Sequence, residues 1–513
     1  MERLASYLCD RWQSGAGDGT PLHSAVDGSV LAAASSEGLA LGAALSHARD
    51  VGWPALRALT FRQRGAILSA LSKAIRDDRD ALLDVAAANM GATRGDAKFD
   101  VDGASGTLAF YAALGEQLGD RTYLLDGDEV RLARSPRWVG QHIQVPRRGV
   151  AVHINAFNFP AWNMAEKVAT ALLAGMPVLA KPGTATALVS VRIAERWLAS
   201  GALPAGSFSL LVGSVGDLLD HVGPQDCVVF TGSGSTGQKV KGHPNVLRNG
   251  VPVNVEADSL NACVIGPDLE PGGATFTMAV VEIVRELSQK AGQKCTAIRR
   301  IFVPAALEGA LVEAIADRAA TMEVGDPLAH ETTVGALSTR QQLHDVQQGI
   351  AAIEAAGLQR AWSYDGKVPT GGFHVAPRLY RSDAGVDAPF IHDHEVFGPV
   401  AAIVPYDGSV AAAAALVARG GGSLVSSIFS DDEAFGAALA LEIAPWCGRV
   451  YWGSEKVSDS ATGHGAVLPG TVHGGPGKAG GGEELGGVRG LHFYMQRTAL
   501  QGDAAFLKRA LSA

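Results

Sequence analysis

Short apolar segments alternate with alanine-rich stretches between residues 149 and 255. The apolar segments have the composition of buried strands, and the stretches after them carry apolar residues at helical spacing. Three strand–helix pairs are expected: 150–154 before a helix from about Ala161, 177–181 before one from about Ala187, and 208–212 before one from about Val215. A fourth segment, 227–230, leads into a turn of small residues. This alternation predicts an α/β fold with a parallel, doubly wound sheet, whose ligands bind beyond the carboxyl ends of the strands.

Three other regions complete the pattern. Residues 257–450 form a second α/β block. Residues 129–146 alternate polar and apolar positions around a central Ser-Pro, which predicts an exposed hairpin. Such a hairpin usually finds a partner edge, so we expect a homodimer or a dimer of dimers. The glycine-rich residues 474–487 have the composition of a flexible linker.

Composition narrows the possible partners and compartments. A chain of 513 residues is too long for one core. Its net charge of −9, without a long Lys/Arg cluster, disfavours nucleic acid. The longest apolar stretch, 168–180, is too short to span a membrane, and the charged N-terminus lacks a signal-peptide pattern. We therefore expect a cytoplasmic protein with neither a nucleic-acid nor a membrane partner.

Five scattered cysteines include one in a context that favours catalysis. None belongs to a Cys-x-x-Cys pair, so neither a disulfide framework nor a metal site is expected. Cys295 follows an amphipathic helical run and a glycine-containing turn, and Glu256 lies 39 residues upstream. A thiol and a carboxylate in these settings are typical of a nucleophile and its base. The alternatives are a buried structural thiol and a surface glutamate at a strand end. The other four cysteines are expected as small buried hydrophobes: Cys9, Cys227, Cys263 and Cys447.

The order and spacing of five short motifs resemble the aldehyde dehydrogenase superfamily from about Trp12 to Gln501. The motifs are Asn155-Ala156-Phe157-Asn158-Phe159-Pro160, Lys181-Pro182-Gly183, Phe230-Thr231-Gly232-Ser233, Gly292-Gln293-Lys294-Cys295 and Glu395-Val396-Phe397-Gly398-Pro399. The resemblance implies a Rossmann-type cofactor domain, a second α/β catalytic domain and a small β oligomerisation region. The expected ranges are 1–127 and 148–256 for the cofactor domain, 257–470 for the catalytic domain, and 128–147 and 485–513 for the hairpin and C-terminal tail.

The resemblance also implies catalytic roles. Cys295 would attack the aldehyde carbonyl, and the Asn158 amide would stabilise the oxyanion together with the Cys295 N–H. Glu256 would activate the hydrolytic water, and Lys167 and Glu484 would relay its proton. Asn158 could instead cap a turn before Pro160, and a helical lysine and a loop glutamate could be solvated charges.

A glutamate at position 166 departs from the family pattern. Many relatives carry a bulky aromatic residue there, near the substrate tunnel. Glu166 therefore implies a more polar tunnel, or it is a surface residue.

The same resemblance implies a nicotinamide cofactor. Relatives that prefer NAD often place a glutamate three residues after the matching lysine, whereas this chain has Thr184 after Lys181. Without a carboxylate to repel a 2′-phosphate, and with Lys181, Thr184 and Ser214 able to donate to one, we expect NADP to be preferred, although Thr184 could simply tolerate both cofactors. The expected cofactor-binding residues are Ala156, Phe157, Lys181, Gly183, Thr184, Ser214, Gly232, Ser233, Glu395 and Phe397.

The C-terminal residues 473–487 and 494–498 are unusual for the superfamily. They resemble the dehydrogenase part of ring-opening enzymes in aerobic, CoA-dependent aromatic degradation. Those enzymes often carry a fused hydratase domain, which is not expected after Ala513. The resemblance implies a CoA-linked semialdehyde as substrate. The best candidate is 3,4-dehydroadipyl-CoA semialdehyde, in benzoate degradation. A general aliphatic or semialdehyde dehydrogenase, a CoA-acylating dehydrogenase and a non-catalytic relative remain as alternatives.

Overall fold

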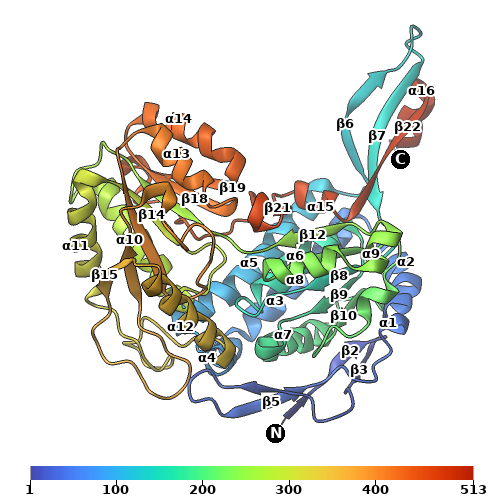
Figure 1. Cartoon of the computed structure of the whole chain (residues 1–513). Helices are drawn as coiled ribbons and strands as arrows, with labels where there is room; N and C mark the ends of the chain where they lie inside the picture. The colour runs from blue at the N-terminus through green and yellow to red at the C-terminus, as the bar shows by residue number, and fades with distance from the viewer. Residues whose placement is uncertain (1, 512–513) are drawn as a thin grey trace.

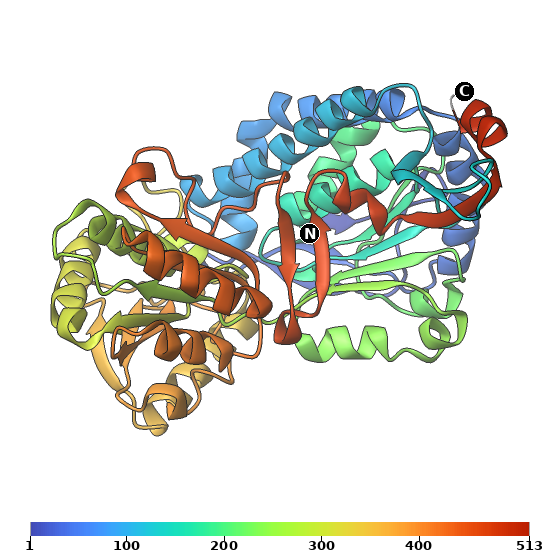
Figure 2. The ribbon, with the colours of Figure 1, turned by 90° about the horizontal axis from the view of Figure 1, so that it is seen from above.

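Two seven-stranded sheets form the two lobes of the molecule, and a three-stranded sheet projects from one of them (Figure 1). The computed structural model describes residues 2–511. Figure 2 shows the lobes side by side, with the first half of the chain in one and residues of the second half in the other. The α/β fold expected from the alternating pattern is confirmed.

The first sheet is mixed. Five adjacent strands are parallel, and an N-terminal hairpin extends the sheet at one side in the antiparallel direction. In spatial order the strands are β12 (Val253–Glu256), β11 (Cys227–Thr231), β8 (Ala151–Ile154), β9 (Val178–Lys181), β10 (Phe208–Leu210), β2 (Ser6–Leu8) and β3 (Arg11–Gln13). Because helices cover both faces, strands such as β11 are buried at every position, which explains their continuous apolar runs.

Helices and a small sheet pack around this first sheet. The helices are α1 (Leu41–His47), α2 (Trp53–Arg57), α3 (Phe61–Asp77), α4 (Arg79–Met90), α5 (Arg94–Leu118), α6 (Trp162–Ala174), α7 (Ala187–Ala199), α8 (Gly234–Lys241) and α9 (Pro244–Asn249). The small sheet contains β1 (Glu2–Leu4), β5 (Val30–Ala34) and β4 (Thr20–His23). The helices expected from about Ala161 and Ala187 are present as α6 and α7.

The prediction of a helix from about Val215 is wrong. This segment contains only a 3-10 turn, Leu218–His221. Gly213 and Gly216, with φ of 118° and 51°, hold the preceding backbone in a conformation that no helix adopts.

The second sheet is parallel except for one edge strand. Its order is β15 (Gln359–Ser363), β16 (Arg378–Arg381), β17 (Val400–Tyr406), β14 (Arg300–Pro304), β13 (Ala262–Ile265), β18 (Ser423–Phe429) and β19 (Cys447–Gly453), with β15 antiparallel. Its helices are α10 (Ala274–Ser288), α11 (Glu308–Ala319), α12 (Arg340–Ala355), α13 (Val410–Ala418) and α14 (Glu433–Ile443). Within residues 2–511, no helix is both long and apolar enough to cross a membrane.

The expected hairpin is longer at its start than the sequence indicated. It consists of β6 (Leu124–Arg131) and β7 (Trp138–Pro146), and β22 (Met495–Asp503) pairs with the whole of β7. This sheet stands away from both lobes, with α16 (Ala504–Leu511) beside it (Figure 1). Large apolar side chains are exposed on this unit: Leu125, Val130, Leu132, Trp138 and Phe506. Oligomerisation through it stays a prediction.

The glycine-rich segment is ordered, so its interpretation as a flexible linker is wrong. It forms the antiparallel pair β20 (Val472–Gly475) and β21 (Gly482–Leu485), which is followed by the short helix α15 (Arg489–His492). β21 contacts β12 of the first sheet, and β20 contacts β18 and β19 of the second. Figure 2 shows the pair between the lobes. A Cβ at Gly480 would lie 2.2 Å from the Val255 carbonyl oxygen, so glycine here permits close packing.

Candidate active site

A small, largely apolar cavity brings together residues from both lobes and from the glycine-rich segment. Its lining residues are Phe99, Asn158, Phe159, Trp162, Asn163, Glu166, Thr231, Glu256, Cys295, Thr296, Gly465, Val467 and His473. Its volume is about 30 Å³, enough for one or two ordered waters. Three of the expected catalytic residues therefore lie in one cavity.

A strained turn delivers Cys295 to this cavity. The turn after α10, Gln289–Gly292, has Lys290 and Ala291 at φ of 52° and 49°. Gly292 has a φ of 70°, and a Cβ there would lie 2.2 Å from the Gly398 carbonyl oxygen. Burial raises the pKa of the Cys295 thiol well above its usual range, and the Glu256 carboxylate raises it further. The resting thiol is therefore protonated at neutral pH.

Glu256 lies at the end of β12 with its side chain buried, so the interpretation as a surface glutamate is wrong. Its carboxylate, the Cys295 sulfur and a ring nitrogen of His473 lie within 4.8 Å of one another. Burial alone would raise the pKa of the Glu256 carboxyl, but His473 and then Lys167 outweigh it and lower the pKa. A carboxylate that stays ionised beside a thiol can accept a proton from it or from a water molecule.

Asn158 lies in the loop after β8 and is buried. Its Nδ2 donates to the Gln293 carbonyl oxygen at 3.0 Å. This bond holds the Asn158 side chain against Gln293, which lies two residues before Cys295 in the chain. Asn158 and Cys295 line the same cavity, so the amide can serve as a hydrogen-bond donor there.

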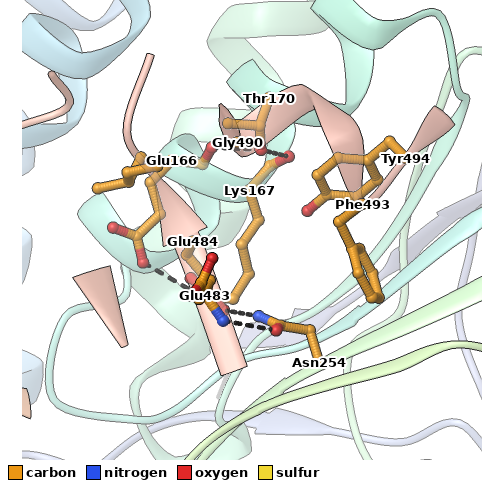
Figure 3. A pocket seen from close by; sticks show the side chains of 10 residues that line it. Glu166, Lys167, Thr170, Asn254, Glu483, Glu484, Gly490, Phe493 and Tyr494 are labelled. Carbon is orange, nitrogen blue, oxygen red and sulfur yellow. Dashed lines mark hydrogen bonds and ion pairs between the residues drawn. The ribbon is translucent and has the colours of Figure 1, made fainter. Parts of the chain in front are cut away.

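A second cavity contains a buried charge cluster (Figure 3). Lys167 Nζ lies 3.0 Å from Glu484 Oε2 and 3.1 Å from Glu166 Oε1, and all three side chains are buried. The interpretations of Lys167 and Glu484 as solvated charges, and of Glu166 as a surface residue, are therefore wrong. Glu484 lies on strand β21 and not in a loop.

The cluster is electrostatically coupled to Glu256. Burial raises the pKa of Glu484 to about 7, although Lys167 opposes this shift. Burial would lower the pKa of Lys167, but Glu484, Glu166 and Glu256 outweigh it and raise the pKa. Carboxylate oxygens of Glu166, Glu256 and Glu484 lie within 4.8 Å of one another. Glu166 lines both cavities, so within the cluster it is the residue that also borders the cavity of Cys295.

Lys181 and Thr184 meet at the carboxyl end of β9. Lys181 Nζ donates to the Thr184 hydroxyl at 3.3 Å, and this hydroxyl donates to the Gly213 carbonyl oxygen at 2.9 Å. Burial lowers the pKa of Lys181 to about 8. The adjacent Ser214 lines an open cavity of about 540 Å³ at the molecular surface. These polar groups could hold an anionic ligand.

Close backbone packing surrounds this site. A Cβ at Gly183 would lie 2.8 Å from the Phe157 Cα, and the Ala156 N–H donates to the Asn163 side chain at 3.2 Å. The first contact joins the loop after β8 to the loop after β9, and the second ties the loop after β8 to helix α6. Both loops lie at the carboxyl ends of the parallel strands, as the sequence predicted.

Ser233 begins helix α8 directly after β11. Its hydroxyl accepts a hydrogen bond from the Thr236 N–H, and the Gly232 N–H donates to the Glu256 carbonyl oxygen at 3.2 Å. The free N–H groups at the start of a helix attract phosphate groups. The position of Ser233 therefore fits the expected pyrophosphate contact.

Glu395 and Phe397 contact the loop that carries Cys295. Arg299 Nε donates to Glu395 Oε1 at 3.1 Å, and the same guanidinium donates to the carbonyl oxygens of Gly292 and Lys294. Burial raises the pKa of Glu395 to about 7, against the effect of Arg299. Phe397 packs edge-on against Phe157, with ring centroids 6.0 Å apart. Glu395 thus supports the Cys295 loop through Arg299, a contact that the sequence did not indicate.

Sequence reasoning missed His473. It is buried, lines the Cys295 cavity and places Nε2 3.4 Å from Glu256 Oε2. It directly precedes the glycine-rich residues 474–487, whose composition indicated a linker. The packing of β20 beside β12 places it next to Glu256.

Comparison with known proteins gives consistent matches over nearly the whole chain. The model of the aldehyde dehydrogenase family matches residues 12–500. The 3,4-dehydroadipyl-CoA semialdehyde dehydrogenase of Aromatoleum evansii is 44% identical over 480 residues, which cover 92% of this chain and 93% of that protein.

Solved structures show the same fold. The structure of 3,6-anhydro-L-galactose dehydrogenase has a TM-score of 0.85 and 20% identity, covering 98% of this chain and 100% of that chain. The NAD-dependent aldehyde dehydrogenase of Sinorhizobium meliloti has a TM-score of 0.85 and 21% identity, covering 98% and 95%.

Proposed function

Because this chain belongs to the aldehyde dehydrogenase family, we propose that it oxidises a CoA-linked semialdehyde to the carboxylic acid with NADP. The activity itself, that of an NAD(P)-dependent aldehyde dehydrogenase, follows from the family. The best candidate substrate is 3,4-dehydroadipyl-CoA semialdehyde, formed in aerobic benzoate degradation. The observation that carries this choice is the 44% identity to a dehydrogenase of that semialdehyde.

In the acylation step, Cys295 Sγ bonds to the aldehyde carbonyl carbon as the thiol proton leaves, to Glu256 or to solvent water. The carbonyl oxygen becomes an oxyanion, stabilised by the Asn158 amide and the Cys295 backbone N–H. The C–H bond of this thiohemiacetal then breaks and leaves a thioester on Cys295. A bound nicotinamide cofactor supplies the acceptor for the hydride.

In the deacylation step, Glu256 removes a proton from water as the water oxygen bonds to the thioester carbon. The C–S bond breaks, Cys295 leaves as a thiolate that is reprotonated, and the carboxylic acid is released. Lys167 and Glu484 relay the proton away from Glu256. Their contact at 3.0 Å and the proximity of the Glu484 and Glu256 carboxylates support this role.

The cofactor-binding residues fit a dinucleotide with a 2′-phosphate. Lys181 offers a half-buried ammonium at the carboxyl end of β9, and the hydroxyl of Thr184 stands where a carboxylate would repel the phosphate. The start of α8 with Ser233 suits the pyrophosphate. Ala156, Phe157, Gly183, Gly232 and Ser214 shape the backbone around the cofactor. Glu395 and Phe397 would contact its nicotinamide end.

Substrate choice can be tested by following cofactor reduction with the purified protein. We expect the highest kcat/KM with 3,4-dehydroadipyl-CoA semialdehyde, compared with free aliphatic and aromatic aldehydes. A CoA moiety adds many contacts remote from the reacting carbon, and their binding energy can lower the barrier. Equal rates with free aldehydes would leave the dehydrogenase activity standing and contradict the CoA-linked substrate.

Cofactor choice can be tested with Thr184→Glu. We expect this variant to lose about tenfold or more in NADP affinity while NAD affinity rises or stays constant, because two negative charges a few ångströms apart repel. Binding is measured by titrating each cofactor against the intrinsic fluorescence of the protein. Thr184→Gln is the matched control, since it has nearly the same size without the charge, and it should retain the NADP preference. A wild-type protein that binds NAD more tightly than NADP would contradict the assignment.

A further inference from the structure

His473 forms a buried contact with Glu256. It lies on β20, which packs beside β12, the strand that ends at Glu256. Its Nε2 is 3.4 Å from Glu256 Oε2, and the two side chains are 5% and 2% exposed. At this depth an ion pair is screened little by solvent, so its partner has a large effect on the carboxylate.

The charges around the pair leave His473 as the first partner of Glu256. Glu256 faces His473, Lys167 and the Cys295 thiol, and the carboxylates of Glu166 and Glu484 lie close by. Lys167 is itself shared between Glu166 and Glu484, at 3.1 and 3.0 Å. Its charge is therefore divided among several carboxylates.

The surroundings of His473 favour its charged form. Burial would lower the pKa of its imidazole, but Glu256 and then Glu166 outweigh burial, and Arg449 opposes them. The net shift is upward, and it adds to the geometric case for a buried imidazolium–carboxylate pair. The 3.4 Å contact is an ion pair and not a well-directed hydrogen bond, because Glu256 Oε2 accepts no such bond from the described residues.

We propose that His473 is a positioning residue for Glu256, holding its carboxylate ionised and aimed at the cavity so that it can activate the hydrolytic water. This role rests on the proposed function. In that step Glu256 takes one proton from water, the water oxygen bonds to the thioester carbon, and the C–S bond to Cys295 breaks. Lys167 and Glu484 relay that proton away from Glu256, and the departing thiolate is reprotonated. His473 exchanges no atom with the substrate.

Deacylation depends on the pair more than acylation does. Of the two groups that must lose a proton, a thiol is intrinsically the stronger acid, with a free pKa of about 8.5, although burial and Glu256 raise that of Cys295. Bulk water has a pKa of about 15.7 and needs a positioned base. Loss of His473 should therefore slow the steady rate while the first turnover remains.

The test compares His473→Gln and His473→Leu with wild type in rapid-mixing assays across a pH series. We expect both variants to give a burst of about one reduced cofactor per active site, followed by a steady rate about tenfold or more below wild type at neutral pH. This decrease in rate is smaller than the roughly 10²–10⁴-fold acceleration that a general base contributes. The acidic limb of the steady rate should move up by about 1–3 pH units, since an opposite charge at this distance lowers a carboxyl pKa by that much.

The control is His374→Gln, a change at another buried histidine that does not line the cavity. It should keep the wild-type pH profile. Thermal unfolding of each variant checks the fold, and the burst itself reports folded, reactive protein.

Two results would overturn the proposal. One is an unchanged pH profile and steady rate in both His473 variants. The other is loss of the burst in a folded variant, which would place His473 in acylation. A wild-type protein without any cofactor reduction would instead contradict the proposed function, so the two failures are distinguishable.

Discussion

Cys295→Ala is expected to abolish aldehyde oxidation, with a fall in kcat/KM of about four to six orders of magnitude. Alanine cannot bond to the carbonyl carbon, so neither the thiohemiacetal nor the thioester forms. No other cysteine among the described residues lines the cavity, and Thr296, the neighbouring hydroxyl, donates to the Gly465 carbonyl oxygen. The measurement is reduction of the cofactor with the preferred semialdehyde.

Cys447→Ala is the matched control for this prediction. Cys447, at the start of β19, is a buried thiol that contacts Ser426 on β18. It does not line the cavity. Its replacement should leave the oxidation rate near wild type. If Cys295→Ala retained a rate within tenfold of wild type, covalent catalysis by this thiol would be wrong and a non-covalent hydride transfer would have to be considered.

The sequence predicted the fold well wherever burial left a simple pattern. Strands such as β11, buried on both faces, are continuous apolar runs, and the helices that follow them keep helical spacing. Because the chain leaves parallel strands at one edge, the loops after β8, β9 and β11 had to meet there. Glu256 ends one strand of this sheet and Asn158 follows another, whereas Cys295 follows a helix and was joined to Asn158 only through the family resemblance.

Charged residues inside a helix could not be interpreted in this way. All of α6 is buried, including Glu166 and Lys167, because the helix is covered on every side. Helical spacing predicts which face points away from one neighbour, and it does not reveal that Glu484 on a remote strand covers that face. The pair could only be proposed from a family resemblance.

Glycine content was equally ambiguous. A run such as 474–487 has the composition of a mobile linker, yet the same residues permit backbones to approach closely. A Cβ at Gly474 would lie 2.1 Å from the Gly482 carbonyl oxygen, so these strands require glycine. Since His473 and Glu484 lie within or next to this run, the error about its structure also hid the partner of Glu256.

Glu256→Gln is expected to separate the two chemical steps. The variant should release about one reduced cofactor per active site in a burst and then turn over about 10²–10⁴ times more slowly than wild type. Glutamine keeps the size of the side chain and cannot accept a proton from water. The thioester should therefore accumulate on Cys295, and mass spectrometry of the quenched protein should show the acyl group.

Glu483→Gln on β21, the strand that contacts β12, provides the control. It makes the identical chemical change one residue from Glu484, at an exposed position. It should keep the wild-type steady rate, which separates loss of the base from loss of one negative charge. A normal steady rate in Glu256→Gln would mean that another group activates the water. Glu166 would then be the first to examine, because its carboxylate lines the same cavity and lies within 4.8 Å of Glu256.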